Sequence, residues 1–174
     1  MTKKELTSKE YFRYLSLIHL ALVSGLALFG IFAYYLVSMG LFAGPSMDLY
    51  KTFGIMVIIV VIAGFGVSMY MTKTRMESTK VKTDLKTKLG DYQATTIIKL
   101  ALLEGPGLFA IVAYMLTANY IVLAIAGLII VYFFFNIPSQ ARVIKDLELN
   151  SSEIALMENP DAVVAIVQVN SKKW

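Results

Sequence analysis

Residues 18–29, IHLALVSGLALF, recur eighty positions later in the chain as residues 98–109, IKLALLEGPGLF. Without gaps, eleven of the nineteen positions from 18 to 36 are identical to their counterparts from 98 to 116. Apolar composition alone rarely produces such a match, so we interpret the two stretches as an internal duplication. Because one complete hairpin separates the copies, they run in the same direction and form a parallel repeat.

Both copies lie within long apolar segments of a chain that has 174 residues, of which 57% are hydrophobic and only 16% are charged. A soluble domain rarely has this composition. An apolar helix of about 20 residues spans the ~30 Å of hydrocarbon in a bilayer. Lipid offers no hydrogen-bond partner, so the backbone N–H and C=O groups of such a segment must bond to each other, as they do in a helix. The four apolar blocks are Leu15–Leu36, Phe53–Met71, Ile97–Thr117 and Tyr120–Ile137. We therefore predict an all-α fold, an integral membrane four-helix bundle built from two tandem, parallel-oriented helical hairpins.

The basic residues give this bundle a predicted orientation. Fifteen of the sixteen Lys and Arg residues fall on one side of the four blocks. Under the positive-inside rule that side is cytoplasmic, which predicts a four-pass protein of the cell membrane with cytoplasmic N and C termini. The predicted organisation is a cytoplasmic N-terminal segment (1–14), a first transmembrane hairpin (15–71), a basic cytoplasmic loop (72–94), a second transmembrane hairpin (95–137) and a cytoplasmic amphipathic tail (138–174).

Glu104 is the only carboxylate within the four blocks, about seven residues or ~10 Å beyond the start of its block. Ionisable groups at such depth are costly and are frequently functional. Pro106 has no N–H to donate to the carbonyl of Leu102, so that oxygen is left free. With Gly105 and Gly107 on either side, Pro106 is predicted to form a helix hinge.

Glu104 and its expected neighbours are the candidate ion- or proton-binding residues. Ser24 occupies the equivalent position of the first repeat, and His19, the only histidine, lies about one turn nearer the cytoplasm. A carboxyl group beside a free carbonyl could hold a proton or a small cation, with His19 as a proton-sharing partner. A purely structural role for Glu104 and a contact with a ligand or partner are alternative interpretations.

The stretch from Leu102 to Val112, LLEGPGLFAIV, resembles the ion-binding helix of rotary-ATPase proteolipids, the c and K subunits. There a membrane-embedded Glu is followed by small residues, an aromatic residue and an apolar run. The duplicated hairpin layout is also similar to the vacuolar-type K subunit. This resemblance implies that Glu104 would be the ion carrier.

The tail after Pro138 carries three further helix signals. Residues 141–149 alternate charged and apolar residues, as in an amphipathic helix near the membrane surface. Ser151 or Ser152 followed by Glu153 predicts the start of a second short helix, and Asn159-Pro160-Asp161 predicts a third over residues 162–169. We expect these pieces to dock on residues 73–91, on a sister subunit or on another partner.

Chemistry-bearing motifs are otherwise absent from the sequence. The chain has no cysteine and one histidine, and it carries no nucleophile elbow, phosphate-binding loop, metal-ligand spacing or dinucleotide fingerprint. We expect no enzyme activity, no catalytic residues, no metal, no cofactor and no nucleic-acid partner. The predicted function is a small structural or interaction protein in the lipid bilayer, as a homo-oligomer or in a larger membrane complex. The alternative is a proton- or cation-binding proteolipid-like subunit.

Overall fold

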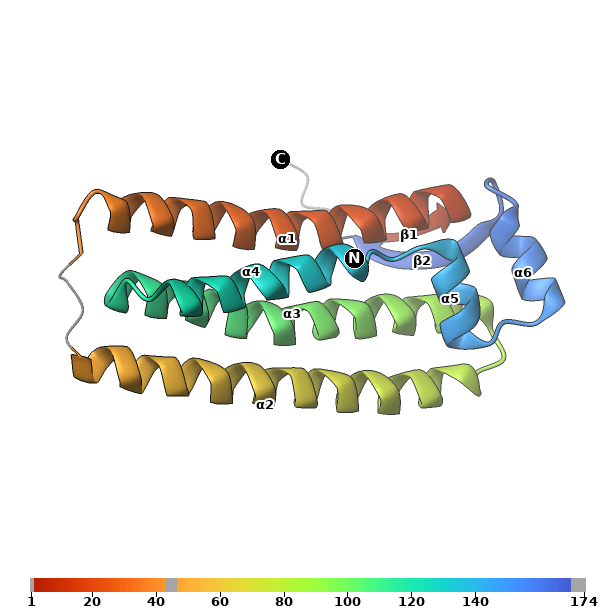
Figure 1. Ribbon diagram of the computed structural model, residues 1–174. Coiled ribbons are helices and arrows are strands. Elements are labelled where there is room, and N and C mark those ends of the chain that lie inside the picture. The colour runs from red at the N-terminus through yellow and green to blue at the C-terminus, as the bar shows by residue number, and fades with distance from the viewer. Residues whose placement is uncertain (1, 43–46, 170–174) are drawn as a thin grey trace. The chain divides into compact units, whose positions relative to one another are not determined.

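A computed structural model (Figure 1) describes residues 2–42 and 47–169 of the protein. Its elements in chain order are β1 (Thr2–Thr7), α1 (Ser8–Ser38), α2 (Met47–Lys80), α3 (Leu85–Thr117), α4 (Tyr120–Phe135), α5 (Gln140–Leu147), α6 (Ser151–Glu158) and β2 (Val163–Val169). The chain is thus mainly helical, as predicted, with two short strands in addition.

The chain forms two compact units, and each is described by itself. The polar unit consists of residues 1–19, 71–97 and 138–174, and the apolar unit consists of residues 20–70 and 98–137. Helices α1, α2 and α3 contribute residues to both units, whereas α4 belongs to the apolar unit.

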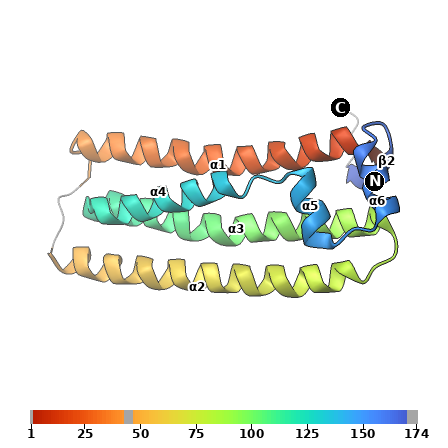
Figure 2. The ribbon, with the colours of Figure 1, turned by 45° about the vertical axis from the view of Figure 1, so that its right-hand side comes forward.

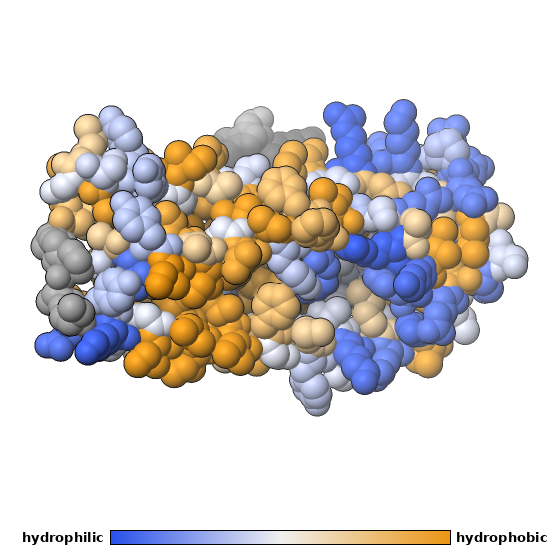
Figure 3. Space-filling model, in the orientation of Figure 1, coloured by the Kyte–Doolittle hydropathy of each residue, from blue (hydrophilic) through white to orange (hydrophobic). Residues whose placement is uncertain are grey.

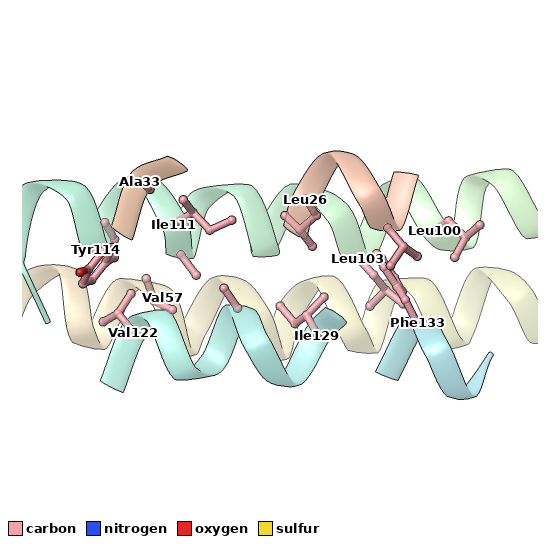
Figure 4. Close-up of a cluster of buried hydrophobic side chains, with 14 residues drawn as sticks. Leu26, Ala33, Val57, Leu100, Leu103, Ile111, Tyr114, Val122, Ile129 and Phe133 are labelled. Atoms are coloured by element: carbon pink, nitrogen blue, oxygen red, sulfur yellow. The ribbon is translucent and has the colours of Figure 1, made fainter. Parts of the chain in front are cut away.

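In the apolar unit, four helices lie side by side, with α3 and α4 between α1 and α2 (Figures 1 and 2). Buried side chains from all four helices form one hydrophobic cluster (Figure 4). The central helix α3 supplies the largest share, including Leu103, Ile111 and Tyr114, and α4 adds Val122, Ile129 and Phe133. Burying a side chain of this size contributes about 1.5–3 kcal/mol when the alternative is exposure to water. Lipid removes most of this gain, so helices in a membrane are held together mainly by close packing.

The outer surface of the apolar unit is hydrophobic. Figure 3 shows hydrophobic residues over the helices of this unit and hydrophilic residues over the polar unit. Helices α1, α2 and α3 are long and apolar enough to cross a membrane, and a fourth span is counted if α4 and the short helix after it form one crossing. Helix α4 has 16 residues, which corresponds to ~24 Å. The protein therefore has three to four helices suited to a membrane.

The polar unit joins the two ends of the described chain. Strands β1 and β2 pair antiparallel, with Glu5 opposite Ile166 and Leu6 opposite Ala165. A second hydrophobic cluster includes Leu6 and Ala165 of these strands, and Tyr11, Leu15 and Leu89 are among its other buried members. It includes residues from all three chain segments of the unit, so these segments form one core.

Two expectations about this unit are wrong. The segment 72–94 is not a loop, because α2 continues to Lys80, α3 begins at Leu85 and only residues 81–84 form the turn. Its Lys-rich sequence favours helix, and the Asp84 carboxylate caps α3 by accepting a hydrogen bond from the Thr87 N–H at 3.0 Å. Of residues 162–169, which were expected to form a helix, 163–169 form strand β2, because this run rich in β-branched residues pairs with β1.

The two other tail helices are present. Helix α5 covers most of residues 141–149, and α6 begins where Ser151 and Glu153 predicted it, with Asn150 and Glu153 forming a capping box. The apolar side of α5 is buried in the core of the polar unit through Val143 and Leu147. Its amphipathic pattern therefore serves packing within the protein, and its expected location near the membrane surface stays a prediction.

Candidate functional site

Glu104 lies on α3 within the apolar unit, and its side chain is half-buried. Among the described residues its carboxyl group forms no hydrogen bond and no ion pair. Apolar side chains precede it at Leu102 and Leu103. The site therefore offers a single carboxyl group that has no polar partner in the described part of the chain.

The carbonyl of Leu102, the oxygen that Pro106 leaves free, faces helix α2. A β-carbon placed on Gly64 would lie 3.1 Å from this oxygen and 2.5 Å from Cγ of Pro106. The two helices approach so closely here that only glycine fits on α2. A weak Cα–H···O contact across a helix interface is the interaction available to such a carbonyl. Leu102 and Pro106 thus contribute to helix packing.

The hinge glycines differ in their surroundings. A β-carbon on Gly107 would lie 2.9 Å from Leu26 of α1, whereas one on Gly105 would meet nothing within 4 Å. Helix α3 is assigned as continuous from Leu85 to Thr117, through Pro106. Gly107 is therefore a packing position between α3 and α1, and the hinge itself stays a prediction.

Ser24 does not form a ligand set with Glu104 in the described part of the chain. Ser24 is half-buried on α1 and forms no hydrogen bond through its side chain with Glu104 or Leu102. His19 is buried in the polar unit, so its expected pairing with Glu104 stays a prediction. Across residues 2–42 and 47–169, no three His, Asp or Glu side chains are placed to hold a metal ion.

Sequence reasoning missed a polar cluster around Lys99. Its ammonium group donates to Oδ1 of Asn136 at 3.0 Å and lies 5.7 Å from the centroid of the Tyr132 ring. The amide of Asn136 in turn donates to the Tyr132 carbonyl, and the Ser68 hydroxyl donates to the Lys99 carbonyl at 3.2 Å. These bonds join α2, α3 and the C-terminal end of α4. An Asn near the end of an apolar block was the available signal.

The polar unit has the more elaborate side-chain network. Lys88 of α3 and Glu153 of α6 form an ion pair of 2.7 Å, with side chains only 7% and 8% exposed. The other carboxylate oxygen of Glu153 accepts from the Asn150 N–H at 2.9 Å. Because this carboxylate both pairs with a charge and caps a helix, it holds α6 in one position on α3.

Two tyrosines extend this network to the other segments. The Tyr11 hydroxyl of α1 donates to the Leu89 carbonyl at 2.8 Å, and the Tyr92 hydroxyl donates to Asp146 of α5 at 3.3 Å. Burial raises the pKa of Tyr92, and the nearby Asp146 carboxylate raises it further. Buried and half-buried polar contacts thus connect the N-terminal, central and C-terminal parts of the chain. The ion pair between Lys88 and Glu153 confirms the expected docking of the tail on residues 73–91.

Comparison with known proteins gives this chain no relative. No protein-family model matches it, and no curated protein or solved structure matches it significantly. Functional inference therefore rests on its own residues.

Proposed function

We propose that this chain is a four-pass membrane protein of structural or interaction type, and that its polar unit is a cytoplasmic platform for assembly with itself or with a larger membrane complex. The observation that carries the proposal is the polar unit. Three segments distant in sequence fold into one core there, and a buried ion pair holds its C-terminal helix. A buried ion pair contributes little net stability but fixes one arrangement, which suits a surface that must keep its shape.

The chain path supports an even number of crossings. Residues 20–70 and 98–137 each leave the polar unit and return to it. A segment that starts and ends on one side of a membrane crosses it an even number of times. The second segment contains only part of α3 and α4 as helices, so α4 would be the returning span.

The charge distribution supports a cytoplasmic polar unit. Fourteen of the sixteen Lys and Arg residues belong to it, and only Lys51 and Lys99 belong to the apolar unit. The positive-inside rule favours the cytoplasm for the side that carries such an excess.

Cysteine labelling tests the topology, because the chain has no cysteine of its own. Single variants Tyr120→Cys and Lys145→Cys in sealed cells would be treated with a membrane-impermeant maleimide. We expect labelling of residue 120 from outside and of residue 145 only after the membrane is opened. Labelling of both from outside would contradict the four-pass proposal.

Assembly is tested by native gel electrophoresis of mild detergent extracts. We expect the wild-type chain to migrate in a particle larger than a monomer, and Lys88→Met to shift it to smaller particles. Migration of both proteins as monomers would contradict the interaction function.

Proton or cation binding through Glu104 is the second candidate, favoured by a half-buried carboxyl group within a membrane helix. A hydrophobic carbodiimide distinguishes the two functions. Labelling of Glu104 that sodium or high pH suppresses would favour ion binding.

A further inference from the structure

A groove of about 290 Å³ lies between the N-terminal ends of α2 and α4 in the apolar unit. Its walls are aliphatic, with Ile55 and Ile58 on α2 and Ile121 and Ile125 on α4. Its size is near the lower limit of ligand pockets, which suits one extended hydrocarbon chain better than a bulky molecule.

Two hydrogen-bond donors lie along this groove. Lys51 is exposed, and among the described residues it forms no ion pair, including with Asp48 one turn earlier. Asn119 is only 5% exposed, and its Oδ1 already accepts from the Ile121 N–H at 2.9 Å. This bond leaves the Asn119 Nδ2 group as a donor with no hydrogen bond in the described part of the chain.

The free amide is directed toward α2. Asn119 Nδ2 is the atom that a β-carbon on Gly54 would meet, at 3.9 Å. Lys51 precedes Gly54 by three residues and therefore lies on the same side of α2. A ligand that brings an acceptor oxygen to this donor would gain a hydrogen bond.

The groove also has the polarity of a lipid. Lys51 and Asn119 come just before the apolar runs of α2 and α4, at headgroup level, and the isoleucines continue for about two turns, or ~10 Å, into the hydrocarbon. Lys51 is the only cation among the described residues at this end of the apolar unit. An anionic phosphate at headgroup level, with an acyl chain extending from the same glycerol into the hydrocarbon, matches both features, and basic pockets between membrane helices bind phospholipid headgroups.

We propose that this groove binds a phospholipid, with its phosphate accepting hydrogen bonds from Lys51 and Asn119 and one acyl chain lying along the four isoleucines. The proposal does not depend on whether the chain crosses the membrane three or four times.

Native mass spectrometry of the full chain in detergent tests the proposal. The probes are dioleoylphosphatidylglycerol, dioleoylglycerol with the same chains but no phosphate, and oleate. We expect the phospholipid to bind about tenfold more tightly than dioleoylglycerol, which is the effect of one charge-assisted hydrogen bond. Equal binding of the two, or tighter binding of oleate than of the phospholipid, would overturn the proposal.

Variants assign the binding to the groove. Lys51→Met removes the charge, and Asn119→Asp keeps the oxygen that caps α4 but replaces the donor with an anion. We expect each to weaken phospholipid binding about tenfold, and the control Lys73→Met, an exposed cation of the polar unit, to leave it unchanged. Ile125→Trp, which fills the groove, should weaken binding of both glycerolipids. Equal losses in the control and in Lys51→Met would contradict the site.

Discussion

Gly64 of α2 and Pro106 of α3 lie so close together that a β-carbon on Gly64 would be 2.5 Å from Cγ of the proline ring. Pro106 interrupts the hydrogen bonding of α3, and Gly64 brings the backbone of α2 against the same turn. The sequence predicts that Pro106 frees a carbonyl for an ion site, and in the structure the same proline is part of a contact between two helices.

Gly64→Ala should therefore destabilise the apolar unit. The added methyl group must displace either the proline ring or the α2 backbone, and such overpacking costs about 1–3 kcal/mol. The free energy of unfolding would be measured by titrating the protein in mixed micelles with sodium dodecyl sulfate. Gly66→Ala is the matched control, because a β-carbon there meets nothing within 4 Å and alanine favours helix. An equal loss for both variants would contradict the close contact.

Breaking the buried ion pair of the polar unit should have a larger effect. Either Lys88→Met or Glu153→Leu leaves one charge buried without its partner, at a cost of about 3–5 kcal/mol. The double variant should recover most of this loss, because no unpaired charge remains. Urea unfolding of all three proteins in detergent, followed by circular dichroism, measures the coupling.

The exposed ion pair between Lys80 and Glu148 provides the comparison. Their side chains are 32% and 71% exposed, so solvent screens the interaction. Lys80→Met should cost less than about 1 kcal/mol. A similar cost for Lys80→Met and Lys88→Met would show that burial does not decide the strength of these pairs.

The sequence predicted the helices well because hydrophobic length is a local property. The duplication predicts that α1 and α3 occupy equivalent places, yet identical residues have different surroundings in the two copies. Ile31 is 65% exposed and its counterpart Ile111 is fully buried; Tyr34 is 50% exposed and Tyr114 fully buried. Helix α3 lies between other helices, whereas α1 lies at the edge of the apolar unit. The repeat in the sequence does not predict this difference in position.

The polar unit was the part that local patterns could not predict. Strands β1 and β2 are separated by more than 150 residues, so the sequence around either strand does not indicate which segment it pairs with. The pairing of Lys88 with Glu153 spans 65 positions and depends on the tail folding back. For the candidate site, the free Leu102 carbonyl was predicted from Pro106, but its use in packing depends on the distance between α2 and α3, which no local pattern contains.

Glu104→Gln should leave the stability of the protein nearly unchanged. The carboxyl group has no hydrogen bond or ion pair in the described part of the chain, so its amide analogue loses no contact. We expect a change within about 0.5 kcal/mol in the same micellar titration, as for an isolated surface substitution. A loss of several times this size would indicate a partner for Glu104, and sodium-sensitive stability in the wild type alone would support the cation-binding candidate.

Tyr92→Phe should make the polar unit less stable near neutral pH and less sensitive to alkali. The variant loses the hydrogen bond to Asp146, at a cost of about 1 kcal/mol. Burial, reinforced by the Asp146 charge, raises the pKa of Tyr92 in the folded protein. The stabilisation linked to a raised pKa is complete below the unfolded value of about 10 and is lost as the pH rises through the folded pKa. Urea unfolding at pH 8 and pH 11 should therefore show a gap between wild type and variant that narrows at the higher pH, whereas a constant gap would mean that Tyr92 does not titrate differently in the two states.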